Sequence, residues 1–290
     1  MDLTPLVEIV RAAARFDPGD HLPFHAAGQQ VGWVTPQLAG RLEAMTEVFL
    51  VGDFGVALHP DLTAPEDRTR ALARAVDRLA AEGWISGVRH EPYAIRGRFD
   101  EPPLFAIERA AARPFGLTTF AVHVNGLAHR SDGGTDMWIA RRSPTKPIDP
   151  GLLDNLVGGG IAAGYTAAQT LVKECFEEAG ILEPLARKAR PAGLVGLLRE
   201  VPEGVQSEVI FVHDLALPPE FAPWNTDGEV AEFRRVPLQA LPEMLAQDAP
   251  SFTLDAALVI LDCLVRHGVI GPDDRGYQSL VTGLGPKPFG

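Results

Sequence analysis

The sequence is poor in cysteine, in tyrosine and in basic residues. Of its 290 residues only 2 are cysteines and 3 are tyrosines. Two cysteines are too few for a disulfide scaffold and are typical of a protein that folds in a reducing compartment. Lysine and arginine number 26 against 38 aspartates and glutamates, so the formal net charge is −12. An acidic protein repels phosphate backbones and anionic lipids, which argues against nucleic acid or a membrane surface as its main partner.

Long apolar runs suited to lipid are also missing. Residues 155–172 carry no charge, but glycines, Asn155 and other polar side chains interrupt them. The first residues include Asp2 and Glu8, where a signal peptide has a basic region followed by an apolar stretch. We therefore expect a cytoplasmic protein without a membrane-spanning segment.

The remaining composition is that of a globular protein, with 46% hydrophobic and 22% charged residues. At this length a single hydrophobic core is near its limit of growth, so two domains are expected. From about Pro114 the sequence pattern changes to strand-like segments, and we place the domain boundary near Ala112. We predict an α+β fold in two parts, a smaller N-terminal domain over residues 1–112 and a larger domain over residues 113–290.

Hydrophobic periodicity predicts the main elements. Apolar residues recur at helical spacing in the segments 3–16, 68–82, 237–246 and 254–267. Strand-like patterns occur in the segments 48–58, 118–130, 136–142, 194–200, 207–213 and 229–236. This mixture supports the α+β prediction.

The most informative stretch is GGGIAAGYTAAQTLVKECFEEAGI, residues 158–181. Its first half predicts a glycine-rich loop whose backbone, at Gly159 and Gly160, can approach a ligand closely. Thr166 and Gln169 form a capping-box pattern, which predicts that a helix starts there. Gly180 fits the position just past the end of that helix.

Three carboxylates share one face of this predicted helix. Glu174, Glu177 and Glu178 stand at positions i, i+3 and i+4, and each close pair of like charges destabilises an isolated helix by about 0.2–0.5 kcal/mol. A divalent cation would turn the repulsion into a binding site, and ligation by oxygen alone suits Mg²⁺ or Mn²⁺. The alternative is a solvated acidic face, which is common on surface helices. Cys175 falls on the apolar side and is expected in the core.

The segment resembles the Nudix box, a glycine, five residues, a glutamate, seven residues and then REUxEExGU, where U is aliphatic. The stretch from Gly159 to Ile181 has the 23 residues that the pattern requires. The later positions of the pattern are filled by Glu174, Cys175, Glu177, Glu178, Gly180 and Ile181. Two positions depart from it: Tyr165 stands where the first glutamate belongs, and Lys173 replaces the arginine. Without that glutamate, Lys173 is expected to find another partner or to face solvent.

The resemblance implies a fold and a chemistry. It implies a mixed sheet sandwiched between helices, and metal-dependent hydrolysis of a diphosphate linkage in a small molecule. Carried over by position, Glu174, Glu177 and Glu178 are the expected metal ligands, and the Gly159 backbone is expected to add a carbonyl. Cations neutralise phosphate oxygens while an activated water attacks phosphorus. A further carboxylate takes the proton from that water.

Residues outside the box complete the expected site. The candidates for the proton acceptor or an extra ligand are Glu203, Glu208, Glu229 and Glu232, with Glu208 ranked first. The segment ARRSPTK forms the densest basic cluster near the box. Strand alternation sends at most one of Arg141 and Arg142 toward the site, so Arg142 and Lys146 are the expected phosphate-binding residues. Each of these also has a plain surface interpretation. Trp224 is the tryptophan to examine as a substrate platform.

Flanking segments narrow the resemblance to a branch. The segments DPGLLDNLVGGG, RHEPYAI and ERAAARPFG are similar to a Nudix subgroup related to thiamine-pyrophosphokinase-linked proteins. In that subgroup a domain of unknown function precedes the Nudix domain. The resemblance implies hydrolysis of thiamine diphosphate or its oxidised analogues, and we expect residues 1–112 to help recognise the organic half of the substrate, in a monomer or a homodimer.

Two other functions stay open at this point. A Nudix-like isopentenyl diphosphate isomerase would keep the fold, but it needs an acid placed over the hydrocarbon, and a buried Cys175 is a poor candidate. A ligand-binding module without catalysis is favoured by the departures at Tyr165 and Lys173. The three facing glutamates count against it, because a scaffold without a cation gains nothing from their repulsion.

Overall fold

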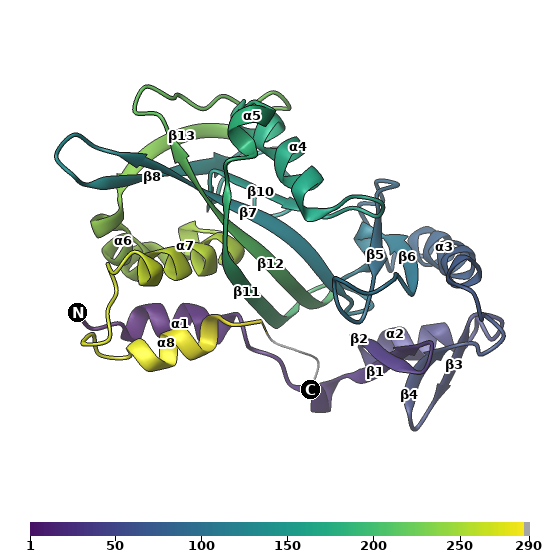
Figure 1. The fold of residues 1–290 in the computed structure, drawn as a ribbon. Coiled ribbons are helices and arrows are strands. Elements are labelled where there is room, and N and C mark those ends of the chain that lie inside the picture. Colours follow the sequence, from purple (N-terminus) through teal and green to yellow (C-terminus); the bar gives the residue numbers. More distant parts are fainter. Residues whose placement is uncertain (287–290) are drawn as a thin grey trace.

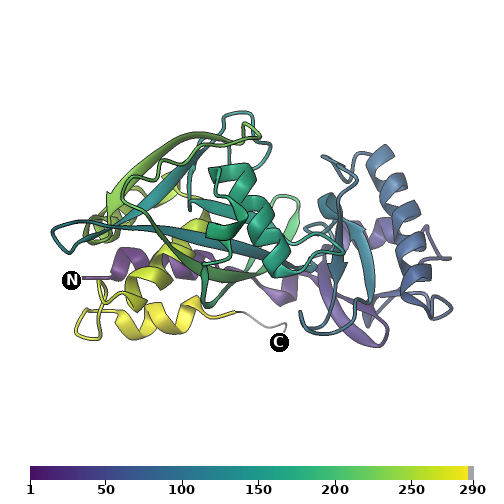
Figure 2. The same ribbon diagram turned by 45° about the horizontal axis from the view of Figure 1, so that its top comes forward.

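The computed structural model describes residues 1–286, so the last four residues of the predicted second domain lie outside the described part. The chain forms a small lobe and a large lobe that lie side by side (Figures 1 and 2). Among the described residues, no helix combines the length and the apolar character needed to cross a membrane. The mixed α+β architecture agrees with the prediction from sequence.

The small lobe is built on a four-stranded sheet and a separate hairpin. The sheet has the order β2-β1-β4-β3, and the hairpin pairs β5 with β6 in antiparallel register. The elements of this lobe are β1 (Leu22–Ala26), β2 (Gln29–Val34), α2 (Pro36–Leu42), β3 (Phe49–Gly52), β4 (Gly55–Leu58), α3 (Pro65–Ala81), β5 (Pro92–Ile95) and β6 (Phe105–Glu108). Phe24, Phe49 and Phe115 stack in its core, and α3 packs on the hairpin.

The large lobe is a seven-stranded mixed sheet. Its main path runs β11-β12-β7-β8-β13, while β10 pairs with β7 and β9 with β8. Strands β12 and β7 are parallel, and the other pairs are antiparallel. The strands are β7 (Thr118–His129), β8 (Thr135–Arg142), β9 (Leu153–Asp154), β10 (Val157–Gly160), β11 (Arg190–Val201), β12 (Gly204–Leu217) and β13 (Val230–Pro237).

Helices cover both faces of this sheet, as the resemblance implied (Figure 1). They are α1 (Thr4–Ala12), α4 (Ala167–Ala179), α5 (Glu183–Ala186), α6 (Leu241–Asp248), α7 (Leu254–Arg266) and α8 (Tyr277–Leu284). On β7, Val122 and Val124 face the core under α4, whereas Ala121 and Leu127 face the core under α7. This alternation follows from the two-residue period of a strand. It places every second side chain of β7 on the α7 face.

The two lobes are not two consecutive segments of the chain. Residues Leu3 to Ala13 are buried in the same core as α7 and α8, so the first helix belongs to the large lobe (Figure 1). An amphipathic helix buries its apolar face wherever a partner surface exists, and sequence periodicity does not identify that partner. At the other end, Phe115 and Leu117 still lie in the core of the small lobe, beyond the predicted boundary near Ala112.

Candidate active site

The helix that carries the three glutamates forms as the sequence predicts. The Thr166 hydroxyl oxygen accepts a hydrogen bond from the backbone N–H of Gln169, and the Gln169 side-chain oxygen accepts one from the backbone N–H of Thr166, so the capping box is complete. Gly180 ends α4 in the left-handed conformation, with φ 65°. Cys175 is fully buried beneath the helix. These caps fix which turn of α4 faces the sheet.

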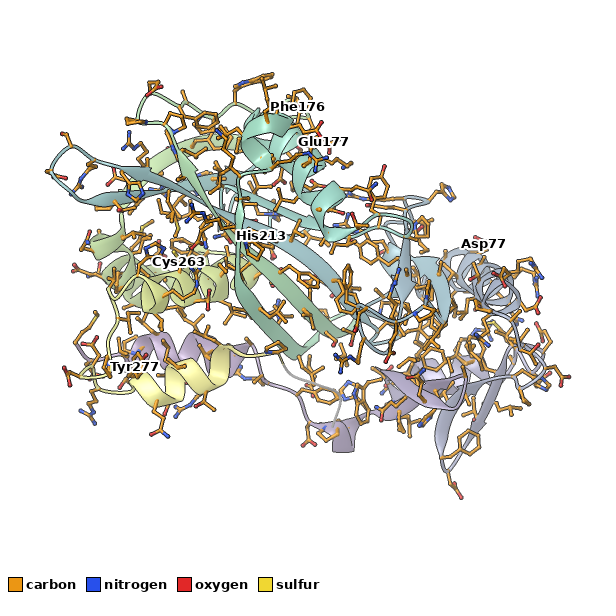
Figure 3. The ribbon with its side chains drawn as sticks, in the orientation of Figure 1. Asp77, Phe176, Glu177, His213, Cys263 and Tyr277 are labelled. Carbon is orange, nitrogen blue, oxygen red and sulfur yellow. The ribbon has the colours of Figure 1, made fainter. Side chains whose placement is uncertain are left out.

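The three glutamates diverge around α4. Successive residues of a helix are about 100° apart, so Glu177 and Glu178 leave Glu174 on opposite sides. The Lys173 ammonium lies 3.0 Å from a Glu174 oxygen and 2.6 Å from a Glu177 oxygen. Lys173 thus finds two carboxylates of the same helix in place of the missing one, while Tyr165 is exposed. Figure 3 labels Glu177 and Phe176 on α4.

The glycines ahead of the helix form a strand, not the loop that the sequence predicts. They make up β10, an antiparallel neighbour of β7. A Cβ atom on Gly159 would lie 2.5 Å from the Glu174 carboxyl carbon, and one on Gly160 would lie 2.0 Å from the Tyr93 hydroxyl. A Cβ on Gly158 would lie 2.8 Å from the His123 ring. Because these glycines have no side chains, there is room beside them for the side chains of Glu174, Tyr93 and His123.

Glu178 is the most buried of the three acids. Its side chain accepts a hydrogen bond of 2.8 Å from the Gly158 backbone N–H and lies 3.5 Å from the Lys146 ammonium. Burial raises the pKa of Glu178 to about 8, although Lys146 and the Gly158 N–H act in the opposite direction. Burial also raises the pKa of Glu174. Two carboxyls with raised pKa values at one strand edge are typical of a functional site.

Glu174 and Glu178 line a cavity of about 350 Å³ between the lobes. The large lobe contributes β7, β10, α4, β12 and the start of α7, and the small lobe contributes residues around the β5–β6 hairpin. The hairpin is joined to the loop after β10, where the Ala163 N–H donates to the Pro92 carbonyl. Of the predicted residues, the cavity is lined by Glu174, Glu178, Glu208, Glu203, Glu229, Arg142, Lys146, Gly159 and Gly160.

The two predicted basic residues lie in the cavity wall but have protein partners. Arg142 pairs with Asp154 at 2.9 Å and donates to the backbone carbonyls of Ile148 and Asp149. Lys146 bridges Glu178 and Glu229. Arg141 points elsewhere, toward Glu232, as alternation on β8 requires. The cavity wall therefore contains cationic and anionic side chains that form ion pairs with one another.

Three predicted or watched residues lie outside the cavity, as far as residues 1–286 are concerned. Glu177 and Glu232 do not line it. Trp224 packs against the end of α4, where its ring meets the Phe176 ring edge to face. Its backbone N–H donates a hydrogen bond to the Ala179 carbonyl. It supports the helix and is not a platform in the cavity.

Comparison with known proteins places the chain. A family model described as NUDIX domain matches residues 119–256, and one described as Domain of unknown function (DUF4743) matches residues 5–119. Nudix hydrolase 24, chloroplastic, of Arabidopsis thaliana is 40% identical over 269 residues, covering 92% of this chain and 73% of that protein. The chain belongs to the Nudix hydrolase family.

A second relative agrees with this assignment. Nudix hydrolase 20, chloroplastic, of the same plant is 37% identical over 294 residues, covering 98% of this chain and 78% of that protein. The solved structure of DR0079 from Deinococcus radiodurans is 22% identical, with a TM-score of 0.45, over 61% of this chain and all of that one. The Nudix family resemblance inferred from residues 158–181 is confirmed. The protein is a hydrolase that acts on phosphorus-containing anhydrides.

The donor set of this Nudix hydrolase fits a hard divalent cation. Glu174 and Glu178 bring carboxylate oxygens to the edge of β10, beside the backbone of Gly158 and Gly159. Such oxygens are the ligands that Mg²⁺ and Mn²⁺ prefer. Within the described residues, the only three metal-ligating side chains with all ligand atoms within 4.8 Å are Asp214, Cys263 and His267. The three box glutamates are thus not gathered at one point: Glu177 does not line the cavity, and Lys173 contacts both Glu174 and Glu177.

Sequence reasoning missed four residues of the Nudix cavity. Tyr93 and Arg109 come from the small lobe, and the Arg109 guanidinium lies 5.7 Å from the centre of the Tyr93 ring. His123 on β7 and Asp255 at the start of α7 also line the cavity. Together with Glu208 they define what we call the inner part of the cavity. Tyr93 and Arg109 stand within RHEPYAI and ERAAARPFG, which the sequence analysis singled out only as flanking matches. His123 and Asp255 have no local pattern that marks them.

Proposed function

We propose that the protein is a metal-dependent pyrophosphohydrolase that cleaves the diphosphate linkage of thiamine diphosphate or its oxidised analogues. The observation that carries the proposal is the pair of box carboxylates, the half-buried Glu174 and the buried Glu178, at a cavity that also presents Arg142 and Lys146. A bound Mg²⁺ or Mn²⁺ would neutralise phosphate oxygens there.

The chain's own residues have distinct parts in this proposal. Glu174 and Glu178, with the Gly159 backbone, hold the cation, and Lys146 and Arg142 orient the phosphates next to it. Phosphate oxygens compete for these two cations with the carboxylates that they now contact.

Glu208 is the proposed proton acceptor for the attacking water. Glu203 lies 3.9 Å from Arg113, and Glu229 is paired with Lys146. Among the described residues Glu208 forms no direct ion pair, and it accepts a hydrogen bond of 3.3 Å from the Thr119 hydroxyl. The Arg109 cation interacts with it only over a longer range. A carboxylate outside a direct ion pair is available to accept a proton. Tyr93 lines the same cavity, and burial raises its pKa.

The small lobe supports recognition of the organic part of the substrate. Its hairpin closes one side of the cavity with Tyr93 and Arg109. These residues belong to the segments whose resemblance implied a thiamine-type substrate. The thiamine identity is the finer part of the proposal, and it is testable apart from the hydrolysis. The cytoplasmic location stays a prediction, and the word chloroplastic belongs to the names of the two plant relatives.

The test is a panel of diphosphate compounds incubated with the protein and Mg²⁺ or Mn²⁺, with products identified by phosphorus NMR. We expect thiamine diphosphate and its oxidised analogues to give the monophosphate and inorganic phosphate at the highest kcat/KM. Faster hydrolysis of another diphosphate would change the substrate but keep the chemistry. Ligand binding without any phosphate release would favour the binding module. An isomerised isopentenyl diphosphate would favour the isomerase, although neither buried cysteine lines the cavity.

A further inference from the structure

A chain of buried polar side chains runs along the α7 face of the large sheet. The His123 Nδ1 atom lies 3.0 Å from the Asn155 side-chain oxygen. The Asn155 amide donates to the Asn125 oxygen at 2.9 Å, and the Asn125 amide donates to Asp214 at 3.0 Å. His123, Asn125 and Asn155 are 6%, 0% and 1% exposed. Buried polar groups of this kind are unfavourable unless every partner is satisfied, so their arrangement is strongly constrained.

Asp214, at the far end of this hydrogen-bonded series of side chains, fixes the direction of every hydrogen bond in the series. Asp214 is held by Arg266 and His267 at the end of α7. Burial raises its pKa, but the hydrogen bonds from Arg266 and Asn125 outweigh that effect and the pKa is lowered. An ionised carboxylate only accepts hydrogen bonds, so Asn125 must donate its amide to Asp214 and accept from Asn155.

The same logic continues to the histidine. Because the Asn155 amide is used as a donor toward Asn125, its oxygen faces His123 as an acceptor. The His123 Nδ1 atom must then carry a hydrogen. In the neutral imidazole this leaves Nε2 as an unprotonated acceptor. A tautomer fixed in this way is known from histidines whose second nitrogen has a defined task.

The Nε2 atom belongs to the inner part of the cavity. His123 lines the cavity, and within residues 1–286 its Nε2 has no hydrogen-bond partner. Glu208 and Asp255 line the same part, both on the α7 side. The Gln206 side-chain amide donates to the Asp255 carboxyl at 3.5 Å. This part of the cavity therefore holds the acceptors His123 Nε2, Glu208 and Asp255 beside the donors Gln206 and Arg113, whereas Arg142 and Lys146 line the phosphate end.

We propose that His123 is a specificity-determining residue, whose unprotonated Nε2 accepts a hydrogen bond from an N–H or O–H group of the substrate's organic part. The chain of Asn155, Asn125 and Asp214 positions it for this contact. The inference deepens the proposed function and rests on it, because it adds a requirement to the diphosphate substrate. The organic group must bear hydrogen-bond donors, as an amino-substituted heterocycle does and a hydrocarbon chain does not.

The first test reads the tautomer directly. Long-range proton–nitrogen NMR correlation on protein labelled with ¹⁵N-histidine distinguishes a protonated ring nitrogen from an unprotonated one. The His123 signals are assigned by their loss in His123→Gln. We expect hydrogen on Nδ1 and none on Nε2 in the unliganded wild type. Hydrogen on Nε2 would overturn the inference, whatever the protein hydrolyses.

The second test separates recognition of the organic group from recognition of the diphosphate. His123→Phe removes the acceptor, and we expect the KM for thiamine diphosphate to rise about tenfold, as for the loss of one hydrogen bond. The inhibition constant of isopentenyl diphosphate, whose organic part has no N–H or O–H group, is expected to change less than twofold. His123→Gln retains an acceptor and should recover part of the loss. His129→Phe, on the exposed end of the same strand, is the matched control.

The outcomes distinguish the inference from the proposed function. Equal changes for both compounds in His123→Phe would contradict the specificity role and leave the hydrolase proposal intact. If the wild-type protein released phosphate from none of the diphosphates, the hydrolase proposal would be contradicted. The tautomer measurement would still test whether Asn155, Asn125 and Asp214 position His123.

Discussion

The phosphate end and the inner end of the cavity are built in different ways. The phosphate end has its proposed cation ligands on one helix and the adjoining glycine strand, about 20 consecutive residues whose caps and spacing are local properties. Arg142 and Lys146 join it from the end of β8 and the loop that follows. The inner end combines β7, β12, α7 and the hairpin of the small lobe, which are far apart in the chain. The comparison indicates that the cation ligands are encoded locally, whereas the proposed proton acceptor Glu208 and the choice of substrate depend on how distant segments pack. The substitutions below test this division, from the largest expected effect to the smallest.

The largest effect is expected at Glu178. Glu178→Gln keeps the shape of the side chain but removes a buried charge at the phosphate end, so we expect kcat to fall at least about 10³-fold with an unchanged far-UV circular dichroism spectrum. Glu177→Gln is also expected to lower kcat, but by less, because Glu177 lies outside the cavity. Glu183→Gln, on exposed α5, is the control. Wild-type turnover in Glu178→Gln would contradict the assignment of the site.

Glu208→Gln tests the proposed proton acceptor. Loss of a general base typically lowers turnover by about 10²-fold or more. We expect this loss in kcat with an unchanged far-UV circular dichroism spectrum. Glu232→Gln, which removes another β-sheet carboxylate outside the cavity, serves as the matched variant. An unchanged kcat in Glu208→Gln would move the role to Glu203 or Glu229.

Gly159→Ala tests the contact between β10 and the helix. The new Cβ atom would lie 2.5 Å from the Glu174 carboxyl carbon, so Glu174 must move. Displacing a ligand-bearing side chain typically reduces activity about 10–100-fold. We expect that loss with little change in melting temperature. Gly40→Ala on α2 has no atom within 4 Å of its Cβ and should leave activity unchanged. A similar loss in both variants would indicate a general effect of alanine.

Tyr93→Phe tests the contribution of the small lobe. The hydroxyl lies beside Gly160 in the cavity, and its removal should raise the KM for thiamine diphosphate about threefold to tenfold with kcat nearly constant. Tyr277→Phe on α8, labelled in Figure 3 away from the small lobe, removes the same hydroxyl elsewhere. If kcat falls while KM stays constant, Tyr93 belongs to the chemistry and the division between the two ends fails.

Asp255→Asn should change the pH dependence of stability. Burial, and then the charge of Glu208, raise the pKa of Asp255 from its ordinary value of 3.8 to about 7. A carboxyl with a raised folded-state pKa stabilises the fold below its ordinary value, and that contribution is lost as the pH rises toward 7. The melting temperature of Asp255→Asn relative to wild type should therefore be higher at pH 8 than at pH 5. Asp53→Asn, on an exposed turn, should show the same difference at both pH values.

The sequence predicts the phosphate end well, because its information is local. The capping box at Thr166 and the left-handed Gly180 define α4, and the spacing of the acids puts Glu174 and Glu178 toward the sheet. The pattern does not show that Lys173 forms ion pairs with Glu174 and Glu177, since side-chain pairing depends on what surrounds the helix. It also does not show that the glycines form strand β10, because their partner β7 lies some 35 residues earlier in the chain.

The inner end was not predictable from local pattern. His123 and Asn125 read as ordinary members of an apolar strand, and only the register of β7 with β12 brings Asn125 to Asp214. The first helix has the right period, but its burial against α7 and α8 is a tertiary choice. Tyr93 reaches the cavity because β5 docks on the loop after β10. In each case the residues are close in space and distant in sequence.

The most direct measurement is anomalous diffraction from a crystal of the protein soaked in Mn²⁺. The account predicts a manganese peak within coordination distance of Glu174 and Glu178, at the free edge of β10. A peak at Asp214, Cys263 and His267 alone, or none near α4, would contradict it.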